Sequence, residues 1–531
     1  MSKWLVAFDT DKIKQYVFRT STLKEIRGAS ALLDRLNCSE MPQLVGGDCI
    51  YANGGGGLFV IDADDPQAPS RAIASVEKLY TTATHSGSIT GAAVPMPANP
   101  AEVKNALALV RHKLRAAKAA SFAPQALVIH PLFRFCDVCG VEYAESDEQD
   151  EQVCRSCAAK RAENRTVQEV IVRWIGGERR TAEQDRLWPR LIAGLGAKGY
   201  PLAGHDRPET FEDLGETSRP RGYMGLIYAD GDNMGRIIEG IDSTAQLGKF
   251  SEAVDGALHD AVADAVAKHL KPGDDGAPLP FDVLLLGGDD LVMVTSAHKA
   301  METAAHIVQK FADLTKDTWG QPLSLSASVT LTHTSYPIGS LIQLADSGLK
   351  FAKRTAAERR LKDPSYSEGL INFLVVNSPN HVEFSRYYRE TLRAKEGTSV
   401  LLRTMRPYTA GDVQGLLTRV RSAHKAPRAK LEQLRAAVFK TRRQGRLDAM
   451  KAVLRTRGDE QRQTLFELVG KVEAAQLNLP WIKRPEGGWT TPILDVVELL
   501  DFVDGAADAD GDLRDSTANG SQNGAEDHAQ S

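Results

Sequence analysis

The stretch LLLGGDDLVMV, residues 284–294, is the most informative part of the sequence about the fold. Two apolar runs flank a Gly-Gly turn, which is the pattern of a buried hairpin whose tip carries Asp289 and Asp290. Adjacent carboxylates held at the end of buried strands repel each other, and a divalent cation would stabilise them. Taken alone, the motif is equally compatible with an acidic hairpin tip that faces water.

A second acidic strand end precedes this hairpin. In GLIYADGDNMG, residues 225–235, an apolar strand leads into Asp230 and Asp232, and a helix is expected to begin near Met234. Carboxylates on two neighbouring strand ends can hold two Mg²⁺ or Mn²⁺ ions, which align an attacking hydroxyl, an α-phosphate and a leaving pyrophosphate. The backbone around Gly231 and the start of the helix offers N–H groups to phosphates.

The two motifs together predict the candidate site. The predicted catalytic metal ligands are Asp230, Asp289 and Asp290. The predicted nucleotide contacts are Gly231, Asp232, Asn233, Gly287 and Gly288.

ADGDNMG followed by LLLGGDD resembles the active palm of the CRISPR type III large-subunit family, the biggest protein of the Csm and Cmr effector complexes. The resemblance implies a palm related to those of GGDEF and adenylate cyclase enzymes, with ATP as substrate. It also implies that the helix over residues 338–354 supplies cations to the triphosphate, which assigns Lys350, and Lys353 after it, to the β- and γ-phosphates. Ser326 and Ser328, on a strand expected over 323–332, are candidates for contact with a base or ribose.

The N-terminal part repeats the pattern without the acidic turn. Asp9-x-Asp11 parallels Asp230-x-Asp232, and the glycines at 54–57 parallel residues 287–290, so that Gly56 and Gly57 align with the two aspartates. This first palm is expected to be non-catalytic while its bare backbone, at Gly55 and Gly56, lets a nucleotide approach. A glycine-rich loop without function is the alternative. DKIKQYVF and LKEIRGAS, in residues 11–30, also resemble the first palm of the family.

Four cysteines predict a metal site between the palms. Cys136 and Cys139 form one CxxC pair and Cys154 and Cys157 another, with 14 residues between the pairs. This spacing fits a structural Zn²⁺ with four thiolate ligands, and the family resemblance implies a zinc module at this place.

Composition excludes several classes of protein. No apolar run reaches the roughly 20 residues that span a bilayer, and charges follow the first strand at once, so neither a membrane span nor a signal peptide is expected. Cysteine usage fits a reducing compartment, and a cytoplasmic protein is expected. Many family members carry an HD nuclease domain ahead of the first palm; here the first strand starts near residue 4, so a form without it is expected. The dipeptides His205-Asp206 and His259-Asp260 are accordingly interpreted as surface residues.

The C-terminal part reads as a basic helical domain. Residues 401–460 hold fifteen Lys and Arg against five Asp and Glu, which suits RNA or an acidic partner, although a solvated helical face has the same composition. RPYTAGDVQGLL, from Arg406, resembles the C-terminal domain of the family.

The predicted fold is α+β, with two ferredoxin-like palms, a zinc-ribbon insert and a C-terminal helical domain. The expected boundaries are 1–130 for the first palm, 131–165 for the zinc module, 166–220 for a helical linker, 221–378 for the catalytic palm, 379–503 for the basic helical domain and 504–531 for a disordered tail.

Three functions follow from these features. The first is a nucleotidyltransferase that makes cyclic oligoadenylate from ATP in type III CRISPR antiviral defence. The second is a scaffold that binds guide RNA, target RNA and effector subunits, with regulated or no catalysis; the intact aspartates favour the first. A diguanylate cyclase is the third, but GGDD is not GGDEF, and the zinc insert and doubled palm are foreign to that class. Activity of the isolated chain and activity only within a complex stay open as alternatives.

Overall fold

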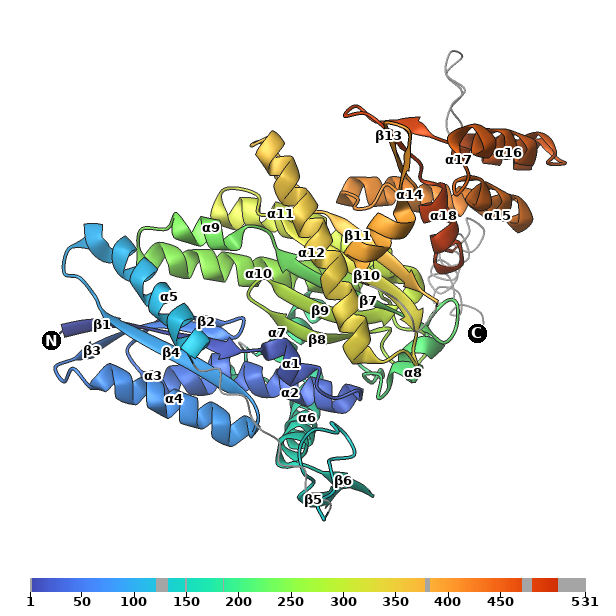
Figure 1. The fold of residues 1–531 in the computed structure, drawn as a ribbon. Coiled ribbons are helices and arrows are strands. Elements are labelled where there is room, and N and C mark those ends of the chain that lie inside the picture. The colour runs from blue at the N-terminus through green and yellow to red at the C-terminus, as the bar shows by residue number, and fades with distance from the viewer. Residues whose placement is uncertain are drawn as a thin grey trace, which may run out of the picture.

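The computed structural model describes residues 2–120, 132–148, 150–184, 186–377, 383–469 and 480–504 (Figure 1). The expected tail beyond Asp504 lies outside these residues. In the described part of the chain, no helix is both long enough and apolar enough to cross a membrane.

The N-terminal palm is a four-stranded sheet with helices packed against it, drawn in blue in Figure 1. The strand order is β2-β3-β1-β4, and β1 pairs antiparallel with both neighbours. Its strands are β1 (Ser2–Asp11), β2 (Asp48–Asn53), β3 (Gly56–Ala63) and β4 (Ser88–Pro95). Its helices are α1 (Ile13–Val17), α2 (Leu23–Arg35), α3 (Met41–Val45), α4 (Ala68–Thr84) and α5 (Val103–Ala120).

The second palm is a five-stranded sheet in the order β11-β10-β7-β9-β8, in which β10 and β11 are parallel and the other pairs antiparallel. The strands are β7 (Tyr223–Gly231), β8 (Phe281–Gly287), β9 (Asp290–Ser296), β10 (Leu325–His333) and β11 (Ile371–Val376). The helices are α9 (Met234–Glu239), α10 (Thr244–His269), α11 (Ala300–Trp319) and α12 (Ile338–Lys362), the last extending eight residues beyond the predicted end.

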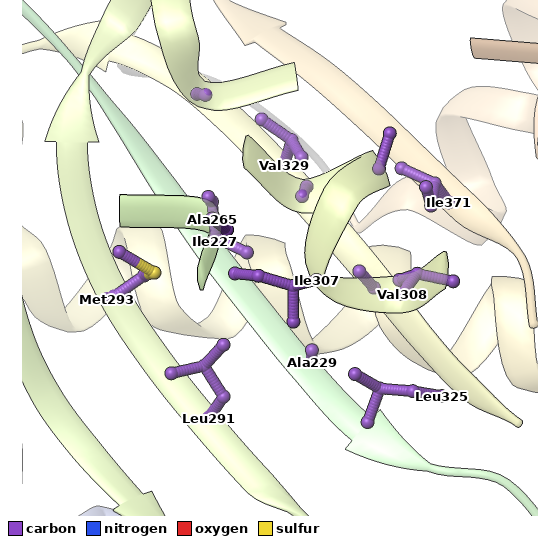
Figure 2. Packing of buried hydrophobic residues seen from close by; sticks show 14 of the residues in the cluster. Ile227, Ala229, Ala265, Leu291, Met293, Ile307, Val308, Leu325, Val329 and Ile371 are labelled. Atoms are coloured by element: carbon purple, nitrogen blue, oxygen red, sulfur yellow. The ribbon is translucent and has the colours of Figure 1, made fainter. Parts of the chain in front are cut away.

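Alternation along β7 buries both faces of the second sheet. Ile227 and Ala229 point to one side, where they join a cluster with residues of α10 and α11. Figure 2 shows Ala265 and Ile307 from these helices beside Met293 and Leu325 of the sheet. Leu226 and Tyr228 point to the other side, against residues of α2 and α12. Because side chains alternate along a strand, an almost continuously apolar sequence predicts a strand covered on both faces, and this prediction is confirmed.

Strand register establishes the internal repeat. Removing β11 leaves the order β8-β9-β7-β10, which matches β2-β3-β1-β4. Asp9 lies opposite Gly56, as Asp230 lies opposite Asp290. Gly55 and Gly56 therefore occupy the places of Asp289 and Asp290. The predicted alignment, which put Gly56 and Gly57 there, is wrong by one residue because it counted glycines and not strand pairs.

The segment between the palms holds the cysteines and two helices that reach the second palm. Its elements are β5 (Ser146–Glu148), β6 (Glu151–Val153), α6 (Arg155–Ile175), α7 (Leu187–Ala197) and α8 (Phe211–Glu216). The predicted boundary at residue 165 falls inside α6, because this helix begins at the second cysteine pair and runs on along α2.

The C-terminal part is mostly helical but is not purely so. Its helices are α13 (Phe384–Tyr387), α14 (Ala410–Ala423), α15 (Arg428–Ala437), α16 (Arg442–Leu454), α17 (Asp459–Val469) and α18 (Ile493–Leu499). A small sheet, in the order β12-β13-β15-β14, accompanies them: β12 (Arg393–Glu396), β13 (Ser399–Leu402), β14 (Ile482–Lys483) and β15 (Trp489–Thr490). The sequence analysis missed this sheet because its strands have at most four residues.

Candidate active site between the two palms

The predicted catalytic aspartates meet at one edge of the second sheet. Asp230, near the end of β7, pairs in register with Asp290, the first residue of β9. Asp289 lies in the turn that precedes it, and Gly288 takes a φ of 60°, which favours glycine. A Cβ atom on Gly231 would come within 2.7 Å of Asp289 Oδ2. The fold thus brings the three carboxylates together, and Gly231 leaves room for one of them.

Electrostatics at this edge favour a bound cation. Burial, and then the neighbouring Asp230, raise the pKa of Asp289 to about 7 and that of Asp290 to about 6. Asp290 Oδ1 is buried without a hydrogen-bond partner. Carboxylate oxygens that are desolvated, mutually repelling and incompletely satisfied are suitable ligands for Mg²⁺ or Mn²⁺, so the residues present fit a divalent ion.

Lys353 supplies a positive charge at the same place. Its ammonium, on α12, donates to Asp230 Oδ2 at 2.6 Å and to the Gly231 carbonyl at 2.7 Å. Carboxylate and carbonyl oxygens are also the ligands that a hard metal cation prefers. The Lys353 ammonium therefore occupies a position that suits such a cation. Among the described residues, the only group of ligand atoms all within 4.8 Å of one another is formed by cysteines. Lys353 thus offsets the charge of Asp230, while the pKa values of Asp289 and Asp290 stay raised.

Lys350, assigned to the same phosphates, lies elsewhere. Its side chain is 70% exposed and its ammonium pairs at 2.5 Å with Asp346, one turn earlier on α12. In this structure Lys353, and not Lys350, contacts the aspartates. The assignment of Lys350 to the phosphates stays a prediction.

Asp232 is buried and hydrogen-bonded within the protein. It is 2% exposed and accepts hydrogen bonds from Ser326 at 2.9 Å and from Arg360 at 3.0 Å. Ser326 is itself fully buried, as Ser328 nearly is, so neither faces a nucleotide. Arg360, near the end of α12, was not singled out from sequence; its signal is an arginine on the same face of the helix as Lys353, two turns later.

The other residues predicted to contact a nucleotide through their backbone have different environments. Asn233 takes a left-handed conformation before α9, with a φ of 61°. Gly287 packs against Gly54 of the first palm, since a Cβ atom on Gly287 would lie 3.3 Å from Gly54 N. The Gly288 N–H already donates to Asp255 at 2.8 Å. Gly288 is therefore not free to bind a phosphate, which corrects that prediction.

The first palm forms the opposite wall of the site. A cavity of about 280 Å³ is lined by Asp9 and Gly56 of this palm together with Asp289 of the other. A larger one, about 710 Å³, is lined by Gly55 and Asp290 among others. Lys14, on α1, reaches across to Asp290 at 3.6 Å. The predicted glycines thus border the cavities that the aspartates enter.

The first palm also retains a counterpart of Lys353. Lys118, on α5, lies 2.5 Å from Asp9 and donates to the Thr10 carbonyl at 3.1 Å. Both lysines stand fifteen residues after the start of the helix that follows the fourth palm strand. This equal spacing was the sequence signal that would have identified Lys118.

The cysteine cluster fits zinc. Ligand atoms of Cys136, Cys139, Cys154 and Cys157 lie within 4.8 Å of one another, and Cys139 Sγ is 3.8 Å from Cys154 Sγ. Zn–S bonds of about 2.3 Å in a tetrahedron place sulfurs about 3.8 Å apart. Cys154 also caps α6 by accepting from the Cys157 N–H. The protein fills all four positions, so a zinc ion here would be structural.

The two His-Asp dipeptides have different environments. Asp206 is exposed, but His259 is 5% exposed, with Nδ1 3.0 Å from the Asp255 carbonyl oxygen. The interpretation of His259 as a surface residue is wrong, because this side of α10 faces the hairpins of both palms.

Comparison with known proteins agrees with this geometry. Residues 223–361 match the family described as Cas10/Cmr2, second palm domain. No curated protein matches the sequence.

Several solved structures share the fold. A Csm1-Csm4 cassette in complex with pppApApA matches with 15% identity and a TM-score of 0.52, over 94% of this chain and 69% of that chain. A cassette in complex with one ATP gives 14% identity and a TM-score of 0.51, over 95% and 70%. A cassette in complex with cA4 gives 15% identity and a TM-score of 0.50, over 94% and 69%.

The relatives are longer than this chain. It spans 53% of the matched chain in a Csm1-Csm4 subcomplex of the type III-A CRISPR-Csm interference complex, and 64% of that in an apo Csm1-Csm4 cassette. Residues 223–361 are thus similar to the second palm domain of the Cas10/Cmr2 family, and the likeness of the wider chain to these solved structures is one of fold.

Proposed function

We propose that the protein is a nucleotidyltransferase that joins ATP into cyclic oligoadenylate in type III CRISPR defence. The observation that carries the proposal is the placement of Asp289 and Asp290, beside Asp230, at cavities walled by the glycine turn of the first palm. Cassettes with the same fold were solved with one ATP, with pppApApA and with cA4. The chemistry of these adenylates fits a site between two palms, one for each reacting nucleotide.

In this proposal Asp230, Asp289 and Asp290 hold Mg²⁺ or Mn²⁺. When bound, such ions lower the pKa of an attacking ribose hydroxyl and stabilise the pyrophosphate that leaves. Asp232 keeps the end of β7 in place through Ser326 and Arg360. Lys353 neutralises Asp230 and, once a triphosphate is bound, donates to its phosphate oxygens. The acceptor nucleotide lies against Gly55 and Gly56, where no side chain obstructs it.

The first experiment incubates the protein with ATP and either Mg²⁺ or Mn²⁺, beside the double variant Asp289→Ala/Asp290→Ala, with products identified by mass spectrometry. A cyclic adenylate formed by the unmodified protein alone supports the proposal and an enzyme that acts by itself. If neither forms product, the assay is repeated with effector subunits, guide RNA and target RNA. Continued absence of product there contradicts the catalytic proposal.

A second function, as a scaffold for RNA and effector subunits, is favoured by the surface of the C-terminal part. Basic side chains on α14, α15 and α16 are exposed, among them Arg419, Arg435, Arg443 and Lys451. Such a surface attracts phosphates or an acidic partner. If it binds RNA, affinity for a single-stranded RNA falls when Arg443 and Lys451 are changed to Gln, and ATP turnover by the isolated chain does not.

A further inference from the structure

One side of α10 presents polar groups to the hairpin turns of both palms. Gly248, Ser251, Asp255 and His259 recur every three or four residues, so they share a face of the helix, and all four line the 710 Å³ cavity. Figure 1 shows this helix running beside β8 and β9. The contacts of this face, taken one at a time, show what it does to the catalytic turn.

Asp255 holds the turn directly. It is 6% exposed, and its Oδ1 accepts the Gly288 N–H at 2.8 Å. Gly288 is the residue before Asp289, so this bond holds the Gly287–Gly288 peptide at the base of the turn that carries the two carboxylates. A hydrogen bond from an amide to a buried carboxylate is among the stronger kinds, and its loss leaves a buried donor without a partner.

Two neighbours hold Asp255 itself. Its Oδ2 is bound by Arg190 of α7, a helix from the segment between the palms. His259, one turn later on α10, has Nδ1 3.7 Å from the same oxygen. The guanidinium offsets the charge of a carboxylate that would otherwise add to the repulsion among the catalytic aspartates.

The same helix face holds the first palm. Asn53, at the end of β2, and Ser251 exchange hydrogen bonds of 3.1 and 3.2 Å. Gly54 then packs on the catalytic turn, since a Cβ atom on Gly54 would lie 3.1 Å from Gly288 Cα. The catalytic turn is thus set between Gly54 on one side and Asp255 on another.

We propose that Asp255 is a positioning residue for the reaction: by anchoring the Gly288 amide, it aligns Asp289 and Asp290 for the divalent ions. This inference rests on the proposed function. It adds Asp255, with Arg190 behind it, to the residues on which metal binding and turnover depend, although neither touches the reacting atoms.

The test compares Asp255→Asn with Asp260→Asn, an exposed position on the same helix. Asn has the size of Asp, but it cannot accept from Gly288 and from Arg190 at once. Residues that orient metal ligands typically contribute about 10- to 100-fold to affinity or activity. Asp255→Asn is therefore expected to weaken Mn²⁺ binding about tenfold and to lower kcat by about 10- to 100-fold, while the KM for ATP changes less than about twofold.

The comparison of Asp255→Asn with Asp260→Asn has two decisive outcomes. Partial recovery of kcat at high Mn²⁺ concentration supports positioning, because general damage to the fold would not respond to the metal. Equal Mn²⁺ affinity and equal kcat in Asp255→Asn and Asp260→Asn overturn it. If Asp255→Asn does not fold, Arg190→Gln replaces it, with the same effects expected at smaller size and the same outcome overturning the proposal.

Mn²⁺ titration of the protein without ATP separates this inference from the proposed function. If the unmodified protein makes no product under any condition, the proposed function fails. Weaker Mn²⁺ binding by Asp255→Asn then still supports alignment of the aspartates, and unchanged binding overturns it.

Discussion

The two palms share a sheet order, a strand register and a lysine, but only one has the acidic turn. Asp9 and Lys118 in the first palm repeat Asp230 and Lys353 in the second, with ammonium–carboxylate distances of 2.5 and 2.6 Å. Thr90 donates to Asp11, at 2.9 Å, as Ser326 donates to Asp232. The difference is confined to two residues, since Gly55 and Gly56 stand where Asp289 and Asp290 stand.

This difference shows that the two carboxylates of the acidic turn are electrostatically unfavourable in the protein alone. The Asp-Lys pair and the supporting hydroxyl persist in both palms, because each satisfies a charge at a strand end. The turn carboxylates have raised pKa values because nothing in the protein alone fully satisfies them. The first palm presents backbone in place of these carboxylates, whereas the second keeps a group of carboxylates whose chemistry fits a divalent cation.

The largest expected effect comes from removing the acidic turn. Asp289→Ala/Asp290→Ala is expected to lower product formation by about 10³-fold, because metal ions contribute several kcal/mol to the transition state. Gly56→Ala is the matched change in the first palm; its Cβ would lie 3.2 Å from the Phe8 carbonyl oxygen, so only a small adjustment is needed. We expect less than about a tenfold loss there. Equal losses, measured as initial rates, would mean that the turn of the first palm matters as much to turnover as the acidic turn.

Exchanging the two lysines for Met tests their equivalence. Lys353→Met is expected to lower kcat/KM for ATP by about 10- to 100-fold, since charged hydrogen bonds contribute about 1.5–3 kcal/mol. In the absence of ATP it should strengthen Mn²⁺ binding, because the cation that competes for Asp230 is gone. Lys118→Met should change kcat/KM by less than about tenfold. Weaker Mn²⁺ binding by Lys353→Met, in calorimetric titration, would contradict the competition.

The raised pKa of Asp289 should make stability depend on pH. Asp289 has a folded pKa of about 7, above its unfolded value, so the folded state retains a proton that the unfolded state releases. Without metal, stability should fall as pH rises from about 4 to about 7 and then stay reduced. Asp289→Asn removes this loss, so its melting temperature should exceed that of the unmodified protein by roughly 2–4 °C at pH 8, for each kcal/mol gained.

The control for that measurement is pH 4.5 in a chelator, where most of Asp289 is protonated and the two proteins should melt much closer together. Saturating Mn²⁺ at pH 8 should reverse the order. A constant difference between the proteins across this range would contradict the assignment.

The smallest expected effects concern the supporting hydroxyls. Ser326→Ala removes a donor to Asp232 and an acceptor for the Leu370 N–H, at 3.1 Å, and should cost about 1–3 kcal/mol of unfolding free energy. Thr90→Val should cost less than about 1 kcal/mol, since Asp11 keeps a hydrogen bond from Ser88 at 2.9 Å. Urea denaturation measures both. A larger loss for Thr90→Val would show that the first palm depends more on its strand end than the second.

Much of the architecture followed from local patterns. The apolar runs flanking Gly-Gly turns predicted both hairpins, and the helix expected over residues 338–354 begins where α12 begins. CxxC spacing predicted the cysteine cluster, because two short pairs can supply four ligands wherever the chain between them turns back. The aspartates were found because their chemistry is unusual at the end of a buried strand.

Other features depended on contacts between distant residues. The choice of Lys353 over Lys350 follows from the orientation of α12 on the sheet. The burial of His259 and the bond from Gly288 to Asp255 follow from α10 lying across the hairpins of both palms. The sequence around two lysines on a helix, or around a single Asp, does not indicate which distant residue each side chain will contact.

Local patterns predicted the hairpins of both palms, the aspartates at the strand ends and the cysteine cluster, because hydrophobic periodicity, glycine turns and acidic or thiol pairs act over a few residues. The tertiary structure alone decided how those residues are used: which lysine neutralises Asp230, which glycines replace the aspartates, and which helix holds the catalytic turn. The physical reason is that charge neutralisation and hydrogen bonding act over a few ångströms in space, between residues that stand 33 (Asp255 and Gly288) and 123 (Asp230 and Lys353) positions apart in the chain.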